Sequence, residues 1–218
     1  MDLQTLWHSF IATSSPLLPS AVLARWALPV FWAVVLVFVA LYFTKSLSKP
    51  RGIWIAVSVA IWAVVPGPWS PTYWLGLAFQ LPSLMTVGLC GLILAAHWRQ
   101  TLQPRVSGAV SAVHGLGILL GWLLLLDTFL VLPFSLYRWG YSPVALAVLS
   151  VMSIGLWAWH KASRARSAAL VMVVLALFVV TRLPSGNVFD AVIDPWLWFA
   201  LQFTAFKHWR ANYRAGSV

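Results

Sequence analysis

Asp127 is the residue whose type and position point most directly to chemistry. It lies within the apolar run 123–130, where its neighbours are leucine, threonine and phenylalanine. A carboxylate inside a membrane-spanning helix costs at least about 2.5–3.5 kcal/mol on insertion scales, so it should face other helices or water. Two interpretations stay open. Asp127 binds a proton, a cation or a solute, or it hydrogen-bonds to a neighbouring helix as a protonated acid.

Two glutamines fall at comparable positions in other apolar runs. Gln80 and Gln202 each lie about seven or eight residues inside the expected external end of a run, and Asp127 lies about seven residues from the external end of its own run. At 1.5 Å per residue, all three fall at a depth of about 10–12 Å. This agreement predicts a polar substrate-binding pocket that opens to the outside. The alternative is that each glutamine hydrogen-bonds between two helices, as polar side chains in membranes commonly do.

Four histidines are the candidate ligands of a haem or metal. His97, His160 and His208 end apolar runs, and His114 lies in the same, expected cytoplasmic half. Two imidazoles facing each other at equal depth would bind a b-type haem. Trp and basic residues surround His97, His160 and His208, so interfacial anchoring is the competing interpretation. His114 shares a stripe with a GxxxG pattern at 117–121, which favours close helix packing. We expect no metal site, with haem b as the alternative cofactor.

The sequence contains no established catalytic motif. No Ser-His-Asp set, HExxH motif, P-loop or GxGxxG motif occurs at a usable spacing. The single cysteine, Cys90, excludes an intramolecular disulfide, and with it the thiol-oxidising membrane enzymes that depend on cysteine pairs. We therefore expect a protein that is not an enzyme and has no catalytic residues.

The composition indicates that these residues are held by elements in a lipid bilayer. Hydrophobic residues make up 61% of the 218 residues and charged residues only 8%, whereas a soluble domain carries about 25% charged residues. The 15 tryptophans are typical of helices that end at membrane–water interfaces. The net charge of +10 does not indicate nucleic acid, because no basic segment is free of apolar sequence. The expected partners are lipid and a membrane protein or another copy of the chain.

Seven apolar runs predict an all-α, polytopic transmembrane helical bundle. A span needs about 20 residues, with a range of about 17–25. We expect a seven-span domain over residues 26–210, an external amphipathic interfacial segment at 1–25 and a cytoplasmic tail at 211–218. The expected spans are 27–44, 53–69, 72–96, 107–134, 142–159, 167–183 and 195–207.

Basic residues between the runs predict the orientation. Of the 14 basic residues, 11 fall on one side of the expected spans, and the other three are Arg25, Arg138 and Arg182. Because basic residues in short loops stay in the cytoplasm, we expect an external N-terminus, a cytoplasmic C-terminus and a location in the inner (plasma) membrane. The 11 are Lys45, Lys49, Arg51, Arg99, Arg105, Lys161, Arg164, Arg166, Lys207, Arg210 and Arg214.

A short match suggests an internal repeat. Residues 74–80 and 196–202 share the pattern WLxxAxQ, and the same two runs later reach His-Trp-Arg at 97–99 and 208–210. The match predicts that spans one to three and five to seven are parallel repeats joined by span four, a 3+1+3 plan found among small transporters. Chance similarity in a sequence rich in Trp and Leu is the alternative.

Three hypotheses of function follow from these patterns. The first is a small permease whose outward-facing polar site consists of Asp127, Gln80 and Gln202. The second is a non-catalytic membrane subunit or assembly factor of a larger complex, suggested by the small size and the scarcity of polar groups. The third is a b-type haem electron-transfer protein that uses histidines of the cytoplasmic side.

Overall fold

The computed structural model describes residues 17–44, 49–99, 112–159 and 162–215. Within these ranges the chain forms helices joined by turns, without a β-strand, which confirms the all-α class. Most of the expected interfacial segment lies outside the described residues. The helices are α2 (Ala21–Phe43), α3 (Lys49–Val64), α4 (Pro71–Phe79), α5 (Leu84–Arg99), α6 (Ala112–Thr128), α7 (Leu136–Trp139), α8 (Pro143–Trp159), α9 (Ala162–Thr181), α10 (Val188–Val192) and α11 (Pro195–Ala215).

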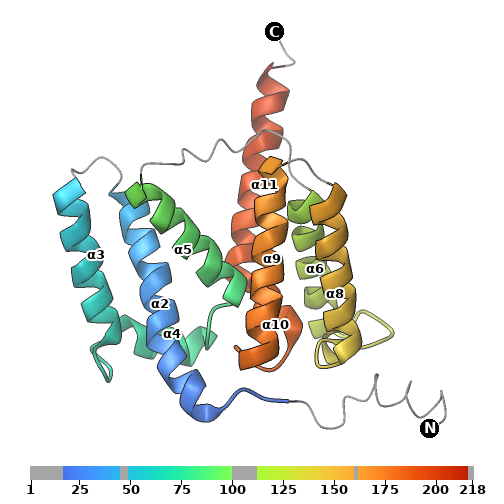
Figure 1. Ribbon diagram of the computed structural model, residues 1–218, viewed down its shortest axis with the longest axis horizontal. Coiled ribbons are helices and arrows are strands. Elements are labelled where there is room, and N and C mark those ends of the chain that lie inside the picture. The colour runs from blue at the N-terminus through green and yellow to red at the C-terminus, as the bar shows by residue number, and fades with distance from the viewer. Residues whose placement is uncertain (1–16, 45–48, 100–111, 160–161, 216–218) are drawn as a thin grey trace.

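The longer helices lie side by side in two groups (Figure 1). In the first group, α2 packs against α3 and α5; in the second, α8 packs against α9, and α6 against α11. The groups meet where α5 contacts α9 and α10. Several of the best-buried apolar side chains lie at this junction, including Val174, Phe178 and Val188, each at most 1% exposed.

Helix α2 begins at a polar cap and is apolar over its length. The Ser20 hydroxyl accepts a hydrogen bond from the Leu23 N–H at 3.2 Å, which satisfies one of the free N–H groups of the first turn. Among the described residues, α2 is the one helix with both the length and the hydropathy to cross a membrane, and shorter apolar helices occur within α5, α6, α8 and α9. Direct support for membrane insertion therefore comes from a single helix near the N-terminus.

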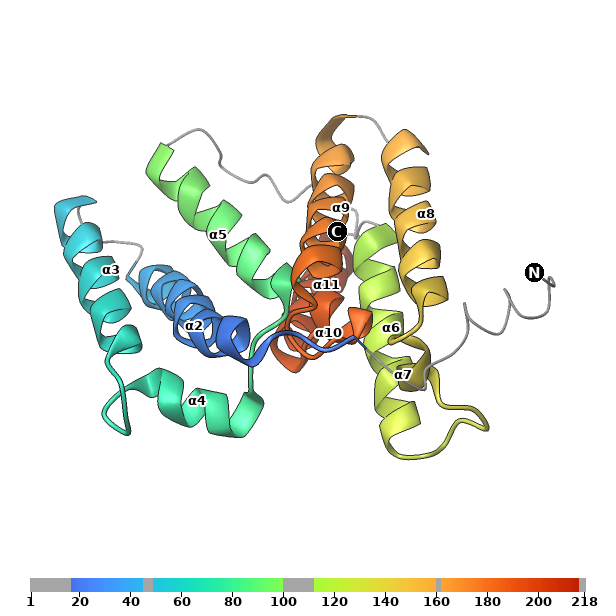
Figure 2. The same cartoon turned by 60° about the horizontal axis from the view of Figure 1, so that its bottom comes forward.

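The third apolar run is not one helix, contrary to the expectation for residues 72–96. Helix α4 ends at Phe79 and α5 begins at Leu84. Gln80 between them has a φ of 58°, outside the right-handed helical region. Pro82 has no N–H to donate and disfavours helical conformation in the preceding residue. As a result α4 lies across the ends of the long helices instead of continuing into α5 (Figure 2).

The fourth apolar run also ends earlier than expected. Helix α6 stops at Thr128 rather than near residue 134. Leu130 has a φ of 57°, and Pro133 follows it, so the chain turns here before α7. Asp127 therefore lies in the last turn of α6 and not about two turns inside a longer helix.

Helix α11 is longer than its apolar run at 195–207. Asp194 caps its first turn by accepting a hydrogen bond from the Leu197 N–H at 2.7 Å, and Pro195 occupies the first helical position, where its missing N–H costs nothing. At the other end the helix continues to Ala215, so part of the expected tail is helical. These last turns extend beyond the ends of the other helices (Figure 1).

The two segments that share WLxxAxQ occupy different positions in the fold. Residues 74–80 belong to the crosswise α4 and end at its break, whereas residues 196–202 form the first turns of the continuous α11. His97-Trp98-Arg99 ends α5, while His208-Trp209-Arg210 lies within α11. The structure therefore gives the proposed 3+1+3 repeat no equivalent third and seventh helices.

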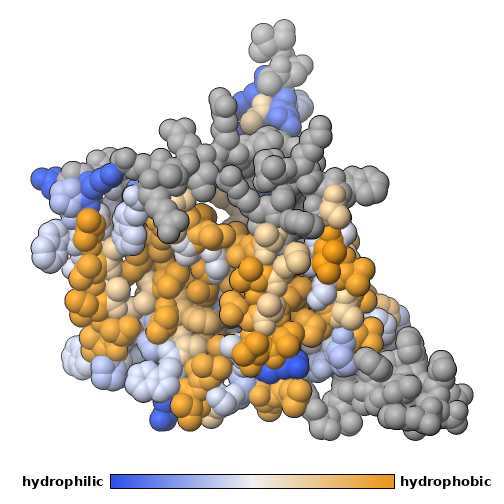
Figure 3. All heavy atoms as spheres, in the orientation of Figure 1, coloured by the Kyte–Doolittle hydropathy of each residue, from blue (hydrophilic) through white to orange (hydrophobic). Residues whose placement is uncertain are grey.

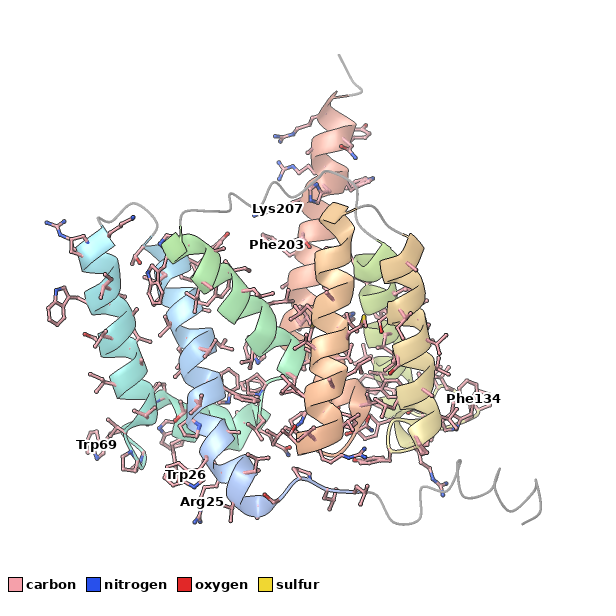
Figure 4. All side chains as sticks on the ribbon, in the orientation of Figure 1. Arg25, Trp26, Trp69, Phe134, Phe203 and Lys207 are labelled. Carbon is pink, nitrogen blue, oxygen red and sulfur yellow. The ribbon has the colours of Figure 1, made fainter. Side chains whose placement is uncertain are left out.

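The surface has an apolar band between two more polar ends (Figure 3). Large apolar side chains are exposed around it, including Phe43 at 80% and Val180 at 83%. Aromatic residues gather at one end of the band, where Trp26 and Trp69 point outward, while Lys207 lies toward the other end (Figure 4). A surface with this much exposed apolar area suits contact with hydrocarbon or a partner rather than water.

Candidate functional site

Asp127 links the end of α6 to the start of α7. It is buried, 7% exposed, and its carboxylate accepts a hydrogen bond from the Tyr137 N–H at 2.7 Å. Ser135, the N-cap of α7, makes no capping hydrogen bond with its own side chain. Asp127 thus supplies the acceptor that the first turn of α7 needs. Its described partner is a backbone N–H in the following loop and not a side chain on another long helix.

Tyr137 also joins this loop to the loop before α11. Its hydroxyl donates to Asp190 at 2.7 Å, and the Ser185 hydroxyl donates to the same carboxylate. Burial, together with the hydrogen bond and the negative charge of Asp190, raises the pKa of the Tyr137 phenol. The phenol therefore stays protonated and keeps donating over the whole neutral range.

Asn187 locks the same two loops together. Its side-chain N–H donates to the Tyr137 carbonyl at 2.8 Å, and the Val188 N–H donates to the Gly140 carbonyl at 2.9 Å. A Cβ at Gly140 would lie 1.9 Å from the Asn187 side-chain oxygen, so only glycine fits. Asp127, Tyr137 and Asn187 are therefore parts of one structural network at the end of the bundle.

Asp194 performs a similar task between distant helices. One carboxylate oxygen caps α11, and the other accepts a hydrogen bond from the Ser83 N–H at 2.8 Å. The Ser83 hydroxyl in turn accepts from the Thr86 N–H at 3.0 Å, which caps α5. The three carboxylates of the described residues, Asp127, Asp190 and Asp194, are thus all engaged in joining segments.

The two glutamines lie apart from Asp127. Gln80 is exposed at the end of α4, and its carbonyl accepts a hydrogen bond from the Trp32 indole at 2.8 Å. Gln202 is half-buried on α11. Helices α4 and α6, which carry Gln80 and Asp127, lie on opposite sides of α9, α10 and α11 in both views (Figures 1 and 2). The described hydrogen bonds do not connect the three side chains, and the polar pocket stays a prediction.

A different feature, an apolar cavity of about 300 Å³, lies inside the second group of helices. It separates the pair α6 and α11 from the pair α8 and α9. Its wall includes Leu120 of α6, Leu201 of α11, Met152 of α8 and Leu170 of α9, and Leu89 of α5 also contributes. The volume exceeds by several times the share of one water molecule, about 30 Å³, and the wall offers water few partners.

The cavity is partly open. Leu116, Leu119 and Met152 line it and are also exposed at the surface, by 38%, 54% and 41%. These residues belong to α6 and α8, so the opening lies between those helices, within the apolar band. At the other end of the lining, Val192 and Ile193 lie next to the loop network.

Two polar side chains line this cavity, His114 and Ser153. The buried Ser153 hydroxyl already donates to the Leu149 carbonyl at 2.8 Å within its own helix. His114 lies at the end of the cavity remote from Val192 and interacts electrostatically with His208 of α11. His114 is therefore the polar side chain that marks this end of the cavity.

The other histidines show no common site. His97 is exposed at the end of α5, and His160 lies outside the described residues. Among the residues the structure describes, no group of three or more His, Cys, Asp or Glu residues could hold a metal ion. Haem b remains untested as the alternative cofactor.

The GxxxG pattern marks the contact between α6 and α11. A Cβ at Gly117 would approach the Leu201 side chain to 2.8 Å, and one at Gly121 would approach the Trp198 ring to 2.2 Å. The Trp198 indole also donates to the Ile118 carbonyl at 3.3 Å. Gly117 and Leu201 also line the cavity, so this close contact forms part of its wall.

The sequence reasoning missed the cavity. Its lining consists mainly of Leu, Met and Val, which look the same in sequence as residues of a packed core. In the sequence, only His114 beside the small residues of 117–121 pointed to a polar group at this place.

No protein-family model, no curated protein and no solved structure matches this chain.

Proposed function

We propose that this chain is a multi-pass protein of the inner (plasma) membrane that is not an enzyme and that binds the hydrocarbon tail of a membrane amphiphile. The cavity between α6 and α8 carries the proposal. Its wall is apolar, and its opening lies at the side of the bundle, where a bilayer would supply lipid chains.

Helix length and surface support insertion of the whole bundle. Helix α2 has 23 residues and α9 has 20, about 35 Å and 30 Å at 1.5 Å per residue. Helix α5 has 16 residues and α6 has 17, about 24–26 Å, which a locally thinned bilayer accommodates at modest cost. The apolar band on the surface is consistent with such crossings (Figure 3).

Charge distribution supports the orientation. Lys49, Arg51, Lys207 and Arg210 lie at the end of the bundle where α11 projects, while the three described carboxylates lie at the opposite end. Basic residues remain in the cytoplasm, so this end is the cytoplasmic one. The loop network around Tyr137 is then external.

The other hypotheses have weaker support from the geometry. The permease site requires Asp127, Gln80 and Gln202 to share a pocket, and the described cavity contains none of them. The role of membrane subunit is compatible with lipid binding and is favoured by the exposed α11 extension, where Phe203, Phe206, Trp209 and Tyr213 are all more than half exposed.

The test is to fill the cavity from α8. Met152 lines it, whereas the adjacent Val151 is 69% exposed and is not part of the lining. We expect Met152→Trp to displace a tail that native mass spectrometry detects on the protein released from lipid nanodiscs, while Val151→Trp retains it. Equal lipid occupancy in the wild type and both variants would overturn the proposal.

A further inference from the structure

The two ends of the cavity differ in polarity. Val192 and Ile193 line its end nearest the external loops, and His114 lies toward the opposite end. Along α6 the lining runs from His114 to Leu123, nine residues or about 13 Å. A bound amphiphile would therefore place its tail toward Ile193 and its head toward His114.

A second imidazole lies on the same side of α11. At 100° per residue, Leu197, Leu201 and His208 fall on one stripe of the helix. The two leucines line the cavity, and His208 follows them toward the cytoplasmic end. His208 is half-buried and interacts electrostatically with His114. The head of the amphiphile would thus meet two imidazoles.

The surroundings of this pair are basic. Lys207 and Arg210 flank His208 on α11, and Lys207 also packs over the Phe203 ring at 4.4 Å. The described carboxylates all lie at the far end of the bundle. An anion at this position therefore meets the attractive charges of Lys207 and Arg210.

We infer that the ligand is an anionic amphiphile, whose carboxylate or phosphate head lies beside His114 and His208 at the cytoplasmic end of the cavity. This inference rests on the proposed tail-binding function. Bilayer hydrocarbon is as apolar as the cavity wall, so burying a tail adds no hydrophobic driving force. The selectivity must come from the head, where a hydrogen bond to a charged group contributes more than a neutral one.

The test compares three probes with the same alkyl chain and a photoreactive diazirine on that chain: a fatty acid, an alkyl phosphate and the corresponding alcohol. The full chain is placed in nanodiscs of zwitterionic phosphatidylcholine, labelled near neutral pH and mapped by peptide mass spectrometry. We expect the cavity-facing peptides of α6 and α8 to react at least about tenfold more with an anionic probe than with the alcohol. The better of the two anionic probes identifies the head as carboxylate or phosphate.

Histidine variants test the position of the head. The preference for the anionic probe should fall in His114→Gln and His208→Gln, and it should persist in His97→Gln, which alters an exposed histidine at the same end. An unchanged preference in both cavity variants would overturn the assignment to this pair. The comparison of probes on the wild type stands even if a variant fails to fold.

The outcomes separate this inference from the proposed function. Equal labelling of the cavity by acid, phosphate and alcohol overturns the anionic head and leaves the tail site in place. Labelling spread over the exposed apolar band, without enrichment in the cavity, overturns both.

Discussion

Asp127 combines burial with a hydrogen bond that a neutral amide can also accept. The Tyr137 N–H needs one oxygen acceptor at 2.7 Å, and both Asp and Asn provide it. We expect Asp127→Asn to change the free energy of unfolding by less than about 0.5 kcal/mol, and Asp127→Leu to lower it by about 1–3 kcal/mol because a partly buried donor loses its acceptor.

Thermal unfolding of the two variants in detergent, followed by circular dichroism, measures this difference. The same pair tests the permease hypothesis. If Asp127→Asn folds normally but abolishes proton-coupled or cation-coupled uptake in vesicles, the carboxylate carries transport and not only structure.

Tyr137 makes the stability of the folded protein fall at alkaline pH. Its pKa is raised by burial and by Asp190, so the folded state favours the protonated phenol more than the unfolded state does, whose pKa is about 10. The stabilisation is complete below pH 10 and is lost as the pH rises from there toward the folded-state pKa.

We expect Tyr137→Phe to lose about 0.5–1.5 kcal/mol at neutral pH and to depend less on pH above 10 than the wild type. Melting temperatures measured from pH 7 to 11 for both proteins show the effect as two curves that converge at high pH. Parallel curves would mean that the phenol does not contribute to the pH dependence.

At the scale of single residues, the sequence predicted which carboxylate is buried, but it did not predict the hydrogen-bond partners of the carboxylates. An acid in the run 123–130 had to be shielded, and Asp127 is shielded. That it would cap α7 could not be predicted, because the contact depends on how the chain turns after Leu130. Asp194 was predictable as a cap because its partner lies three residues away, whereas its bond to Ser83 depends on tertiary packing.

Among the helices, α5 is held at its first residues by a hydrogen bond to a side chain far away in the sequence, Asp194. Asp194→Ala removes the acceptor of both the Ser83 N–H and the Leu197 N–H. We expect a loss of about 2–4 kcal/mol, the sum of a lost helix cap and an unsatisfied buried donor. Hydrogen exchange should show that the Ser83 amide, distant in sequence, loses protection together with the first turn of α11.

A milder variant serves as the control for this prediction. Asp194→Asn keeps one carbonyl oxygen and should lose roughly half as much stability. If Asp194→Ala leaves the exchange of the Ser83 amide unchanged, the described link between α5 and α11 is wrong.

Apolar runs predicted the existence of the long helices but not their ends. Each of the seven runs overlaps a helix of 16 or more residues. The errors fall at 80–83 and 129–134, where the residues are still apolar while the backbone turns. Hydropathy does not register proline or a positive φ, so both runs were read as longer than the helices they contain.

For the whole molecule, orientation is the first property to measure. Reporter fusions within residues 45–48, 100–111 and 160–161, and after residue 215, should all report the cytoplasm, because basic residues cluster there. Fusions in the loop at 129–135 should report the outside. A cytoplasmic signal from that loop, or an external signal from the C-terminus, contradicts seven crossings.

The cavity belongs to the whole molecule and could not be predicted from any one segment. It exists because α6 packs on α11 through Gly117 and Gly121, while α8 packs on α9. Each pair looks well packed in isolation, and the space appears only between them. Sequence periodicity describes one helix at a time and carries no information about such a gap.

The bond from Ser83 to Asp194 spans 111 residues, and this separation has a consequence for biosynthesis. When α5 leaves the ribosome, the carboxylate that its first turn needs has not yet been made, and it arrives just before the last helix. Until then the first group of helices holds an unsatisfied N–H at the point where the second group will dock. A nascent chain stalled before residue 194 should therefore be more accessible to quality-control proteases than one stalled after α11, although nearly all of its apolar helices are complete.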